Sequence, residues 1–302
     1  MDYILTTNSL TKIYGKHKAA DHISINVRQG DIYGLIGRNG AGKTTLLKMI
    51  SGLAAPSEGD FSLFGYKGKE KAKVMHRIGT LIEAPGIYPD LSAYENLKLK
   101  CIAMGVRDMQ VIPKLLKTVG LADTGKKRVG KFSLGMKQRL GIALALIGEP
   151  DLVILDEPIN GLDPQGIIEI RELILRLNRE RQITVLISSH ILDELSRLAT
   201  HYGIIDSGRM VKELSAEELE AACRKCMRMT VSDTKILARV LDSMEVEYKI
   251  LSDTQADVFA KVNVTELTLA LAKEGCEVSE IQERDESLES FYISLVGGGR
   301  ND

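Results

Sequence analysis

The sequence has little that would tie the chain to a membrane, to nucleic acid or to a secretory route. No run approaches the 18 or more apolar residues of a spanning helix. The first ten residues, MDYILTTNSL, lack the basic and apolar regions of a signal peptide. The net charge is -1, from 40 basic and 41 acidic residues, so no overall field attracts nucleic acid or an anionic membrane. We therefore expect a cytosolic protein that does not bind nucleic acid, and we read the basic run GKKRVGK at 125–131 as a solvated loop.

Cysteine is also scarce, and its arrangement favours neither a disulfide nor a metal site. In a reducing compartment the four cysteines are expected to be free thiols. The segment CRKC at 223–226 has redox or zinc spacing, but two further zinc ligands and the βαβ setting of a thioredoxin-like site are both missing. We interpret these two cysteines as thiols on a helix. The four positions are Cys101, Cys223, Cys226 and Cys276.

The length and the order of the elements predict an α/β domain over residues 1–222. The chain has 302 residues, and a single domain has roughly 100–200. Residues 1–66 contain short strands and tight turns, as expected for an antiparallel β subdomain, and about residues 84–148 form a helical subdomain. Apolar strands then alternate with helices over residues 150–206. This order indicates a mainly parallel sheet wrapped by helices.

A change in composition near residues 212–226 indicates a second, smaller domain. The segment KELSAEELEAACRKC reads as a charged linker helix. Residues 223–297 follow in the order βαββαβ, which is typical of a ferredoxin-like α+β domain. We expect residues 298–302 to be a flexible tail.

A glycine-rich stretch after a short apolar run predicts a phosphate-binding loop. GRNGAGKTT follows DIYGLI and has the spacing G-x-x-x-x-G-K-T. Backbone N–H groups of such a loop point at phosphate oxygens, while Lys43 reaches the β- and γ-phosphates and the Thr44 hydroxyl binds Mg²⁺. Kinases, switches, motors and transporters share this loop, so it predicts bound phosphates and not their use. The nucleotide-binding members are Gly37, Arg38, Asn39, Gly40, Ala41, Gly42, Lys43, Thr44 and Thr45.

Two acidic residues follow the buried strand LVIL about a hundred residues after the loop. Ligands bind at the carboxyl edge of open α/β sheets, so Asp156 and Glu157 are expected beside the phosphates. We assign Asp156 to the magnesium ion. Glu157 points elsewhere and can take a proton from an attacking water.

Three further segments occur in a fixed order with the phosphate loop. FSLGMKQRLGIA precedes the acidic pair at 132–143, DEPINGLDP continues past it at 156–164, and LISSH ends at His190. In this order the segments resemble the ATP-binding cassette family, the ATPase subunits of membrane transporters. The resemblance covers about residues 4–215. It implies an enzyme that hydrolyses ATP with Mg²⁺.

The resemblance implies roles for residues outside the phosphate loop. Tyr14 resembles the aromatic residue that stacks on adenine, although a strand-end aromatic is the alternative. Ser133 and Gly135 begin the signature helix, which faces the γ-phosphate of ATP bound to a second copy; Ser133 would also serve as a plain N-cap. Asp163 lies in the loop that crosses the dimer interface. His190 is similar to the histidine that contacts the γ-phosphate, and the alternative is a buried structural histidine.

Two departures from the family pattern point to one branch of it. The family signature has two glycines after serine and then glutamine, whereas this chain has Leu134, Gly135 and Met136. Where the family has a glutamine beside the sheet, this chain has Glu83, which we expect to help hold the metal. Both departures are similar to the bacitracin- and lantibiotic-resistance branch, as is the appended small domain.

The resemblance therefore implies the ATPase subunit of an exporter for antimicrobial peptides. Two copies would close around two Mg-ATP molecules as a homodimer and drive separate transmembrane permease subunits from the cytoplasmic face of the membrane. Residues 84–100 are the expected docking surface. A chromosome or DNA-repair ATPase is one alternative, but such chains place a long coiled coil between phosphate loop and signature. An ATP-sensing regulatory module is the other, and the presence of Glu157 and His190 argues against it.

Overall fold

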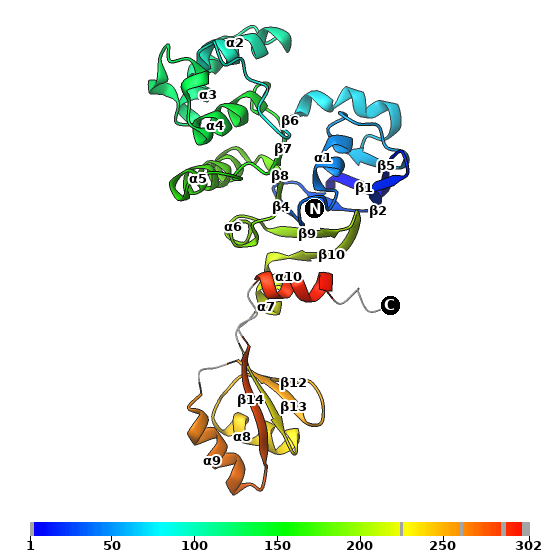
Figure 1. Ribbon diagram of the computed structural model, residues 1–302, viewed down its shortest axis with the longest axis vertical. Helices are drawn as coiled ribbons and strands as arrows, with labels where there is room; N and C mark the ends of the chain where they lie inside the picture. The colour runs from blue at the N-terminus through cyan, green and yellow to red at the C-terminus, as the bar shows by residue number, and fades with distance from the viewer. Residues whose placement is uncertain (1–2, 224–225, 260–261, 285–287, 298–302) are drawn as a thin grey trace. The chain divides into compact units, whose positions relative to one another are not determined.

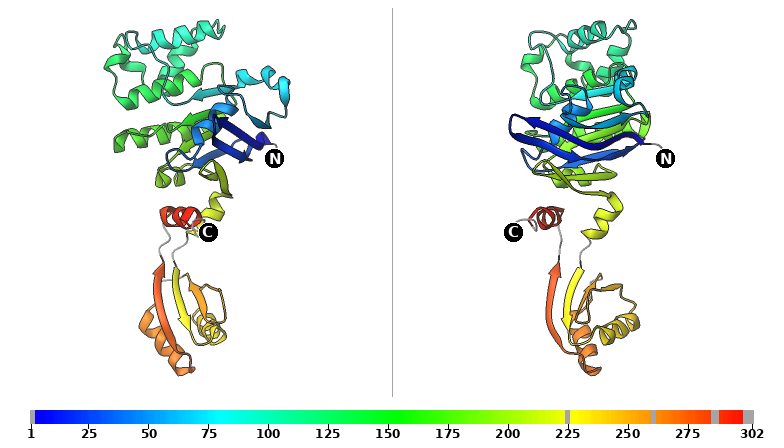
Figure 2. Two further views of the ribbon diagram at one scale, coloured as in Figure 1. Left: turned by 45° about the vertical axis from the view of Figure 1, so that its right-hand side comes forward. Right: turned by 90° about the vertical axis from the view of Figure 1, so that its right-hand side faces the viewer.

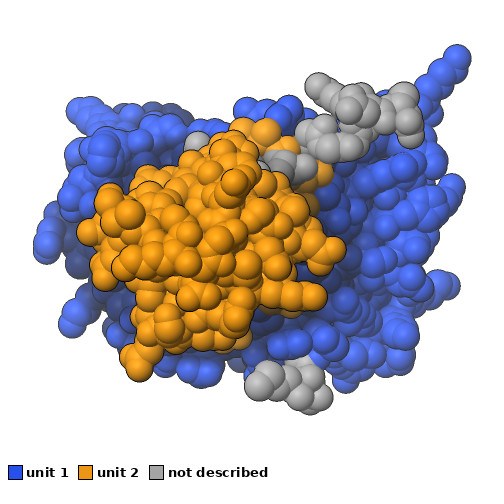
Figure 3. Space-filling model, turned by 90° about the horizontal axis from the view of Figure 1, so that it is seen from below, with its two compact units in different colours: residues 1–216 blue, residues 217–302 orange. Residues whose placement is uncertain are grey.

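The computed structural model describes residues 3–223, 226–259, 262–284 and 288–297. The chain divides into two compact units, residues 1–216 and 217–302, which Figure 3 distinguishes by colour. The tail predicted at 298–302 lies outside the described residues. Across the described ranges, no helix combines the length and the apolar character needed to cross a membrane.

The first unit is built on a six-stranded sheet of mainly parallel strands. The four central strands are buried throughout their middle, as in other parallel sheets with both faces covered, whereas the two edge strands are partly exposed. Five strands run parallel, and the edge strand β10 pairs antiparallel with β9. In spatial order the strands are β10 (Arg209–Ser215), β9 (His201–Asp206), β4 (Ile32–Ile36), β8 (Thr184–Ser189), β7 (Leu152–Asp156) and β6 (Ile78–Leu81).

Helices cover this sheet on both sides (Figure 1). Helix α1 lies on one side, and α5 and α6 lie on the other. Helix α5 begins with proline at its first position, where the missing N–H has no helical partner to lose. The bounds are α1 (Lys43–Ile50), α5 (Pro164–Arg181) and α6 (Leu192–Ser196). Helix α7 (Ala216–Ala222) follows β10 in the chain, at the division between the two units.

An antiparallel sheet at the N-terminus packs with α1 and the parallel sheet (Figure 2). One core cluster joins them, with Leu10 from the antiparallel sheet, Leu47 from α1, and Ile154 and Leu186 from the parallel strands. All four side chains are fully buried. The predicted antiparallel subdomain is therefore present, with the strands β1 (Tyr3–Tyr14), β2 (His17–Ile23), β3 (Asn26–Arg28) and β5 (Glu58–Leu63).

The helical part of this unit begins where the sequence predicted. Ser92 caps α2 with Glu95 in a reciprocal capping box, which satisfies two backbone donors of the first turn. Ser133 caps α4 by accepting from Met136 N at 3.3 Å. The helices are α2 (Ala93–Ala103), α3 (Val111–Thr118) and α4 (Leu134–Ala145), with 3-10 turns at Gly68–Lys73, Met75–Arg77, Ala122–Thr124 and Val129–Lys131.

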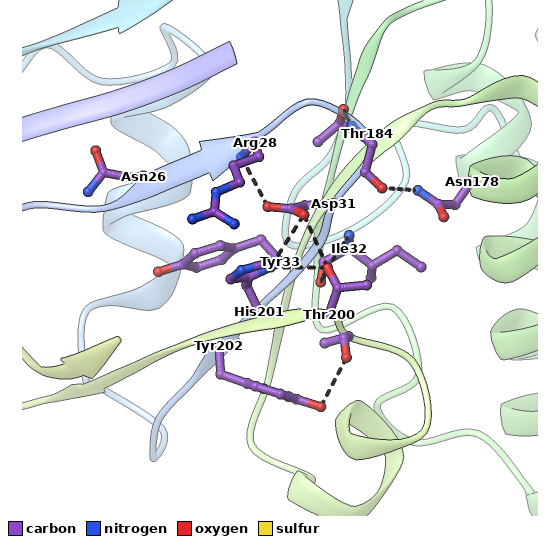
Figure 4. Close-up of polar contacts among 12 residues, drawn as sticks. Asn26, Arg28, Asp31, Ile32, Tyr33, Asn178, Thr184, Thr200, His201 and Tyr202 are labelled. Carbon is purple, nitrogen blue, oxygen red and sulfur yellow. Dashed lines mark hydrogen bonds and ion pairs between the residues drawn. The ribbon is translucent and has the colours of Figure 1, made fainter. Parts of the chain in front are cut away.

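A polar network aligns the amino ends of three neighbouring strands (Figure 4). Asp31, just before β4, accepts from Arg28 N at 3.0 Å and lies 3.3 Å from Nδ1 of His201 at the start of β9. Gly30 N donates to Thr184 Oγ1 at 2.9 Å, which ties β4 to β8. Because the amino ends are fixed in register, the carboxyl ends of the same strands meet at one edge.

The second unit has a four-stranded sheet in the order β12-β13-β11-β14, with every neighbouring pair antiparallel. Alternate residues of β11, such as Met227 and Met229, face a core that Leu237 of α8 and Leu267 of α9 complete. The elements are β11 (Cys226–Val231), α8 (Thr234–Ser243), β12 (Tyr248–Ile250), β13 (Gln255–Val258), α9 (Val264–Lys273), β14 (Val278–Arg284) and α10 (Leu288–Gly297).

Three details of the secondary structure differ from the sequence-based expectations. Residues 212–215 are not helical, because they complete β10, whose pairing with β9 outweighs their helix propensity. The two thiols of 223–226 do not share a helix, since Cys223 follows α7 and Cys226 begins β11. Helix α10 was not predicted.

Candidate functional site

The phosphate-loop segment connects β4 to α1 at the carboxyl edge of the parallel sheet. Gly40 has φ +82° and would meet no atom within 4 Å if it carried a Cβ, so its backbone faces open space. Gly42 is the N-cap of α1 with φ +104°, a conformation that side chains strongly disfavour. The exposed N–H groups at the start of a helix attract anions. The loop is therefore shaped to hold phosphate.

Lys43 is held inside the loop by backbone acceptors. Its side chain is only 5% exposed, and Nζ donates to Gly37 O at 2.6 Å and to Arg38 O at 3.2 Å. A buried ammonium needs such partners because desolvation penalises an unpaired charge. The ammonium is thus held within the loop, where it can bind the oxygens of a triphosphate.

Asp156 ends β7 and joins two elements through its two oxygens. Oδ1 accepts from Ser188 Oγ at 2.6 Å, and Oδ2 accepts from Thr44 Oγ1 at 2.9 Å. The parallel register of β7 and β8 sets Asp156 beside Ser188. Ser188 was not singled out from the sequence, because only the register brings it here.

Thr44 and Asp156 fit a magnesium ion by the chemistry of their side chains. Both supply hard oxygen donors, which Mg²⁺ prefers. Their oxygens lie within hydrogen-bond distance, 2.9 Å, so both side chains face the same point. The described residues contain no group of three or more His, Cys, Asp or Glu able to hold a metal by themselves. Water molecules and nucleotide phosphates are the usual further ligands of Mg²⁺.

Glu157 lies one residue beyond the strand and turns away from Asp156. Its backbone has φ +48°, and its N–H donates to Ser188 Oγ at 3.0 Å. Oε2 lies 2.8 Å from Nδ1 of His190, and Oε1 lies 3.1 Å from Nζ of Lys43. The Lys43 contact is an ion pair without hydrogen-bond alignment, so within the described structure Oε1 has no hydrogen-bond donor. That buried oxygen keeps an acceptor position for a water molecule.

Glu83 follows β6 in a left-handed conformation, with φ +63°. Its carboxylate pairs with Lys48 of α1. This hydrogen bond is the main cause of a raised pKa of the Lys48 ammonium. The structure thus brings Glu83 to the phosphate-loop helix, through a lysine that the sequence had not singled out.

The remaining predicted residues lie on separate elements. Ser133 caps α4 near Gly135, and Asp163 caps α5 by accepting from Gly166 N at 3.1 Å. In the described part of the chain, neither cap residue hydrogen-bonds to the phosphate loop. Tyr14 ends β1 with 49% exposure, and Lys12 Nζ lies 5.1 Å from its ring centroid. An exposed ring face of this kind can stack on a base.

Comparison with known proteins shows which family has a sequence similar to this chain. The sequence matches the family described as "ABC transporter" over residues 20–160. It is 44% identical over 303 residues to the bacitracin transport ATP-binding protein BcrA of Bacillus licheniformis, covering 99% of each chain. It is also 44% identical over 211 residues to the lantibiotic transport ATP-binding protein SrtF of Streptococcus pyogenes, covering 70% of this chain and 90% of SrtF.

Solved structures show the same fold. The ADP conformation of MJ1267, an ATP-binding cassette of an ABC transporter, matches with a TM-score of 0.65 at 26% identity. The match covers 72% of this chain and 93% of MJ1267. An ATP-binding subunit of an ABC transporter matches with a TM-score of 0.63 at 30% identity, covering 72% and 92% of the two chains.

Proposed function

Because the chain belongs to the ATP-binding cassette transporter family, in which it is an ATP-hydrolysing subunit, we propose that it powers export of antimicrobial peptides through separate membrane-spanning subunits. The near-complete coverage of a relative named for bacitracin transport supports this substrate class. We place the chain at the cytoplasmic face of the membrane, where ATP is available.

The cluster of Lys43, Glu157 and His190 is the observation that supports hydrolysis at this edge. We propose that the triphosphate draws Lys43 from Glu157 and leaves the carboxylate free to orient water. The water oxygen attacks the γ-phosphorus, the bond to the β-phosphate oxygen breaks, and Glu157 takes the water proton. His190, fixed through Nδ1 by Glu157, presents its other ring nitrogen to the γ-phosphate.

The magnesium ion belongs to the same proposal. Thr44 and Asp156 would hold it with the phosphates, and Glu83 would add a further carboxylate. When bound, the ion neutralises charge that develops on the phosphate oxygens. Asp156 is kept in place for this role by Ser188.

We further propose that two copies complete each site. Ser133, Gly135 and Asp163 lie at the starts of α4 and α5, separate from the phosphate loop of their own chain. The free N–H groups at the start of a helix favour a phosphate. In a head-to-tail homodimer, α4 of one copy would face the ATP held by the other copy.

A groove beside Glu83 is the proposed docking site for the membrane subunits. A cavity of about 400 Å³ is lined by Ile82 and Pro85 of the loop after β6, by Leu99 of α2 and by Met104 at the C-cap of α2. Exposed apolar side chains surround it, with Tyr88 at 61% exposure. Such patches mark interaction surfaces. This groove overlaps the predicted surface of residues 84–100 and would take a short apolar helix.

The export function can be tested in cells. The chain would be expressed with membrane-spanning proteins encoded beside it in a bacterium sensitive to bacitracin and lantibiotics. We expect the minimum inhibitory concentration of one of these peptides to rise, and the rise to vanish with Lys43→Ala. An unchanged sensitivity to both peptide classes would rule out the proposed substrates.

We expect Glu83→Gln to separate transport from hydrolysis. The side chain lies beside the groove loop and leaves Glu157 untouched, so the ATPase rate of the isolated chain should change by less than about tenfold, or about 1.4 kcal/mol in barrier. Peptide resistance should fall by more than the ATPase rate. A complete loss of ATPase activity, as for a catalytic base, would contradict this division between Glu83 and Glu157.

We propose that the second unit has the ferredoxin-like fold and that the first unit folds without it when the chain ends at the predicted boundary, residue 222. The βαββαβ order, the sheet order and the separate core of the second unit support this assignment. A chain ending at Ala222 should stay folded and bind ATP with an affinity within about tenfold of the full chain. Nucleotide binding and circular dichroism measure this. Insolubility of the shortened chain would mean that both units share one core.

A further inference from the structure

Lys48 and Thr44 lie on one face of α1, four residues apart, and each meets a carboxylate that the nucleotide site could use. Thr44 donates to Asp156, and Lys48 donates to Glu83. The Lys48 ammonium also feels the negative charge of Asp156. A positive charge on the protein therefore stands in contact with Glu83, on the helix whose Thr44 meets Asp156.

The loop that carries Glu83 is held in a strained conformation. Glu83 has φ +63°, which is unfavourable for a non-glycine residue, and such conformations persist where surrounding contacts determine them. Ile82, Ala84 and Pro85 line the groove on one side of this loop, whereas the Glu83 carboxylate reaches α1. The contact with Lys48 thus links the groove loop to the phosphate-loop helix.

We propose that Lys48 is a positioning residue that competes with the magnesium ion for the Glu83 carboxylate. Without nucleotide, the ammonium holds Glu83 against α1. Loading of the site with Mg-ATP requires this carboxylate to leave Lys48, which also releases the groove loop from α1. The inference rests on the proposed role of Glu83 as a metal ligand.

The competition is weak enough to be reversible. The side chains of Lys48 and Glu83 are 29% and 64% exposed, and ion pairs at such sites contribute at most about 1 kcal/mol. Removing the ammonium should therefore shift magnesium dependence by roughly two- to fivefold. A neutral glutamine in place of Glu83 would have no such ion pair to break.

The test is the Mg²⁺ dependence of binding of a non-hydrolysable fluorescent ATP analogue to the full chain. Lys48→Met keeps the aliphatic stem, and we expect it to lower the half-saturating Mg²⁺ concentration roughly two- to fivefold. Lys48→Arg should stay within about twofold of the original chain, because it keeps the charge. Lys73→Met is the matched control, since Lys73 pairs with Glu70, a carboxylate outside the site, at 2.9 Å.

The same titration in the Glu83→Gln chain measures how much of the Lys48→Met effect depends on the Lys48–Glu83 ion pair. There the effect of Lys48→Met should shrink to the part that comes from the more weakly coupled Asp156, because the carboxylate that pairs with Lys48 is gone. A shift of equal size in both backgrounds, or none in the original chain, would overturn the proposal for Lys48. If Glu83→Gln itself leaves the Mg²⁺ dependence unchanged, the proposed metal role of Glu83 fails; if it raises the Mg²⁺ requirement while Lys48→Met has no effect, only the competition fails.

Discussion

Replacing Glu157 by glutamine lowers ATP turnover by about 10²–10⁴-fold, the usual cost of losing a positioned general base. Glutamine keeps the shape of the side chain but cannot take the proton of the attacking water. The buried oxygen Oε1, which faces Lys43 without a hydrogen-bond donor, is the atom expected to orient that water. ATP binding should persist, because Lys43 and the loop backbone are unchanged.

Phosphate release by the purified chain measures this loss. Glu149→Gln is the matched control, since Glu149 is an exposed glutamate with a similar backbone conformation, φ +53° against +48° for Glu157. The control should hydrolyse ATP at the original rate. The loss of a general base usually lowers the rate by about 10²–10⁴-fold. If Glu157→Gln lowers turnover by less than about tenfold, Glu157 is not the base.

Gly42→Ala should lower the affinity for ATP by about 10- to 100-fold, because a displaced loop N–H loses a hydrogen bond to a charged phosphate, which contributes about 1.5–3 kcal/mol. A Cβ at this position would overlap the carbonyl oxygen of Ala19, and φ is +104°. Since Gly42 is the N-cap of α1, the loop backbone and the start of the helix would both have to shift.

Gly30→Ala is the control that separates the two effects expected in Gly42→Ala, the steric clash with Ala19 and the strain of a positive φ. Gly30 has φ +83°, yet a Cβ there would meet no atom within 4 Å. Its substitution should reduce stability by roughly 1 kcal/mol and leave ATP affinity within about twofold. Binding of a fluorescent ATP analogue, together with thermal melting of both variants, makes the comparison. Equal losses of affinity in both variants would contradict a specific role for the close approach of Gly42 to Ala19.

The sequence predicted the ends of those helices and strands that are determined by residues close in the chain. The Ser92–Glu95 box and the Ser133 cap predicted the starts of α2 and α4, because such bonds reach only three residues along the chain. The polar end of the apolar run LVIL likewise predicted where Asp156 would emerge from the sheet.

Contacts between distant segments could not be predicted in this way. Ser188 meets Asp156 only through the register of β7 and β8, and no local pattern encodes register. Lys48 and Glu83 come together only because β6, which precedes Glu83, pairs with β7, the strand that packs against α1. The misassigned strand at 212–215 has the same cause, since its partner β9 decides its conformation.

The mass of the Glu157→Gln chain in solution, measured by analytical ultracentrifugation, tests most directly whether two copies share each ATP. With ATP and Mg²⁺ we expect twice the monomer mass, because bound ATP that is not hydrolysed keeps the phosphate loop of one copy joined to the start of α4 in the other. Without nucleotide, or with Ser133→Arg added, we expect the monomer mass. A Glu157→Gln chain that binds ATP and Mg²⁺ yet stays monomeric at every concentration would contradict the shared site.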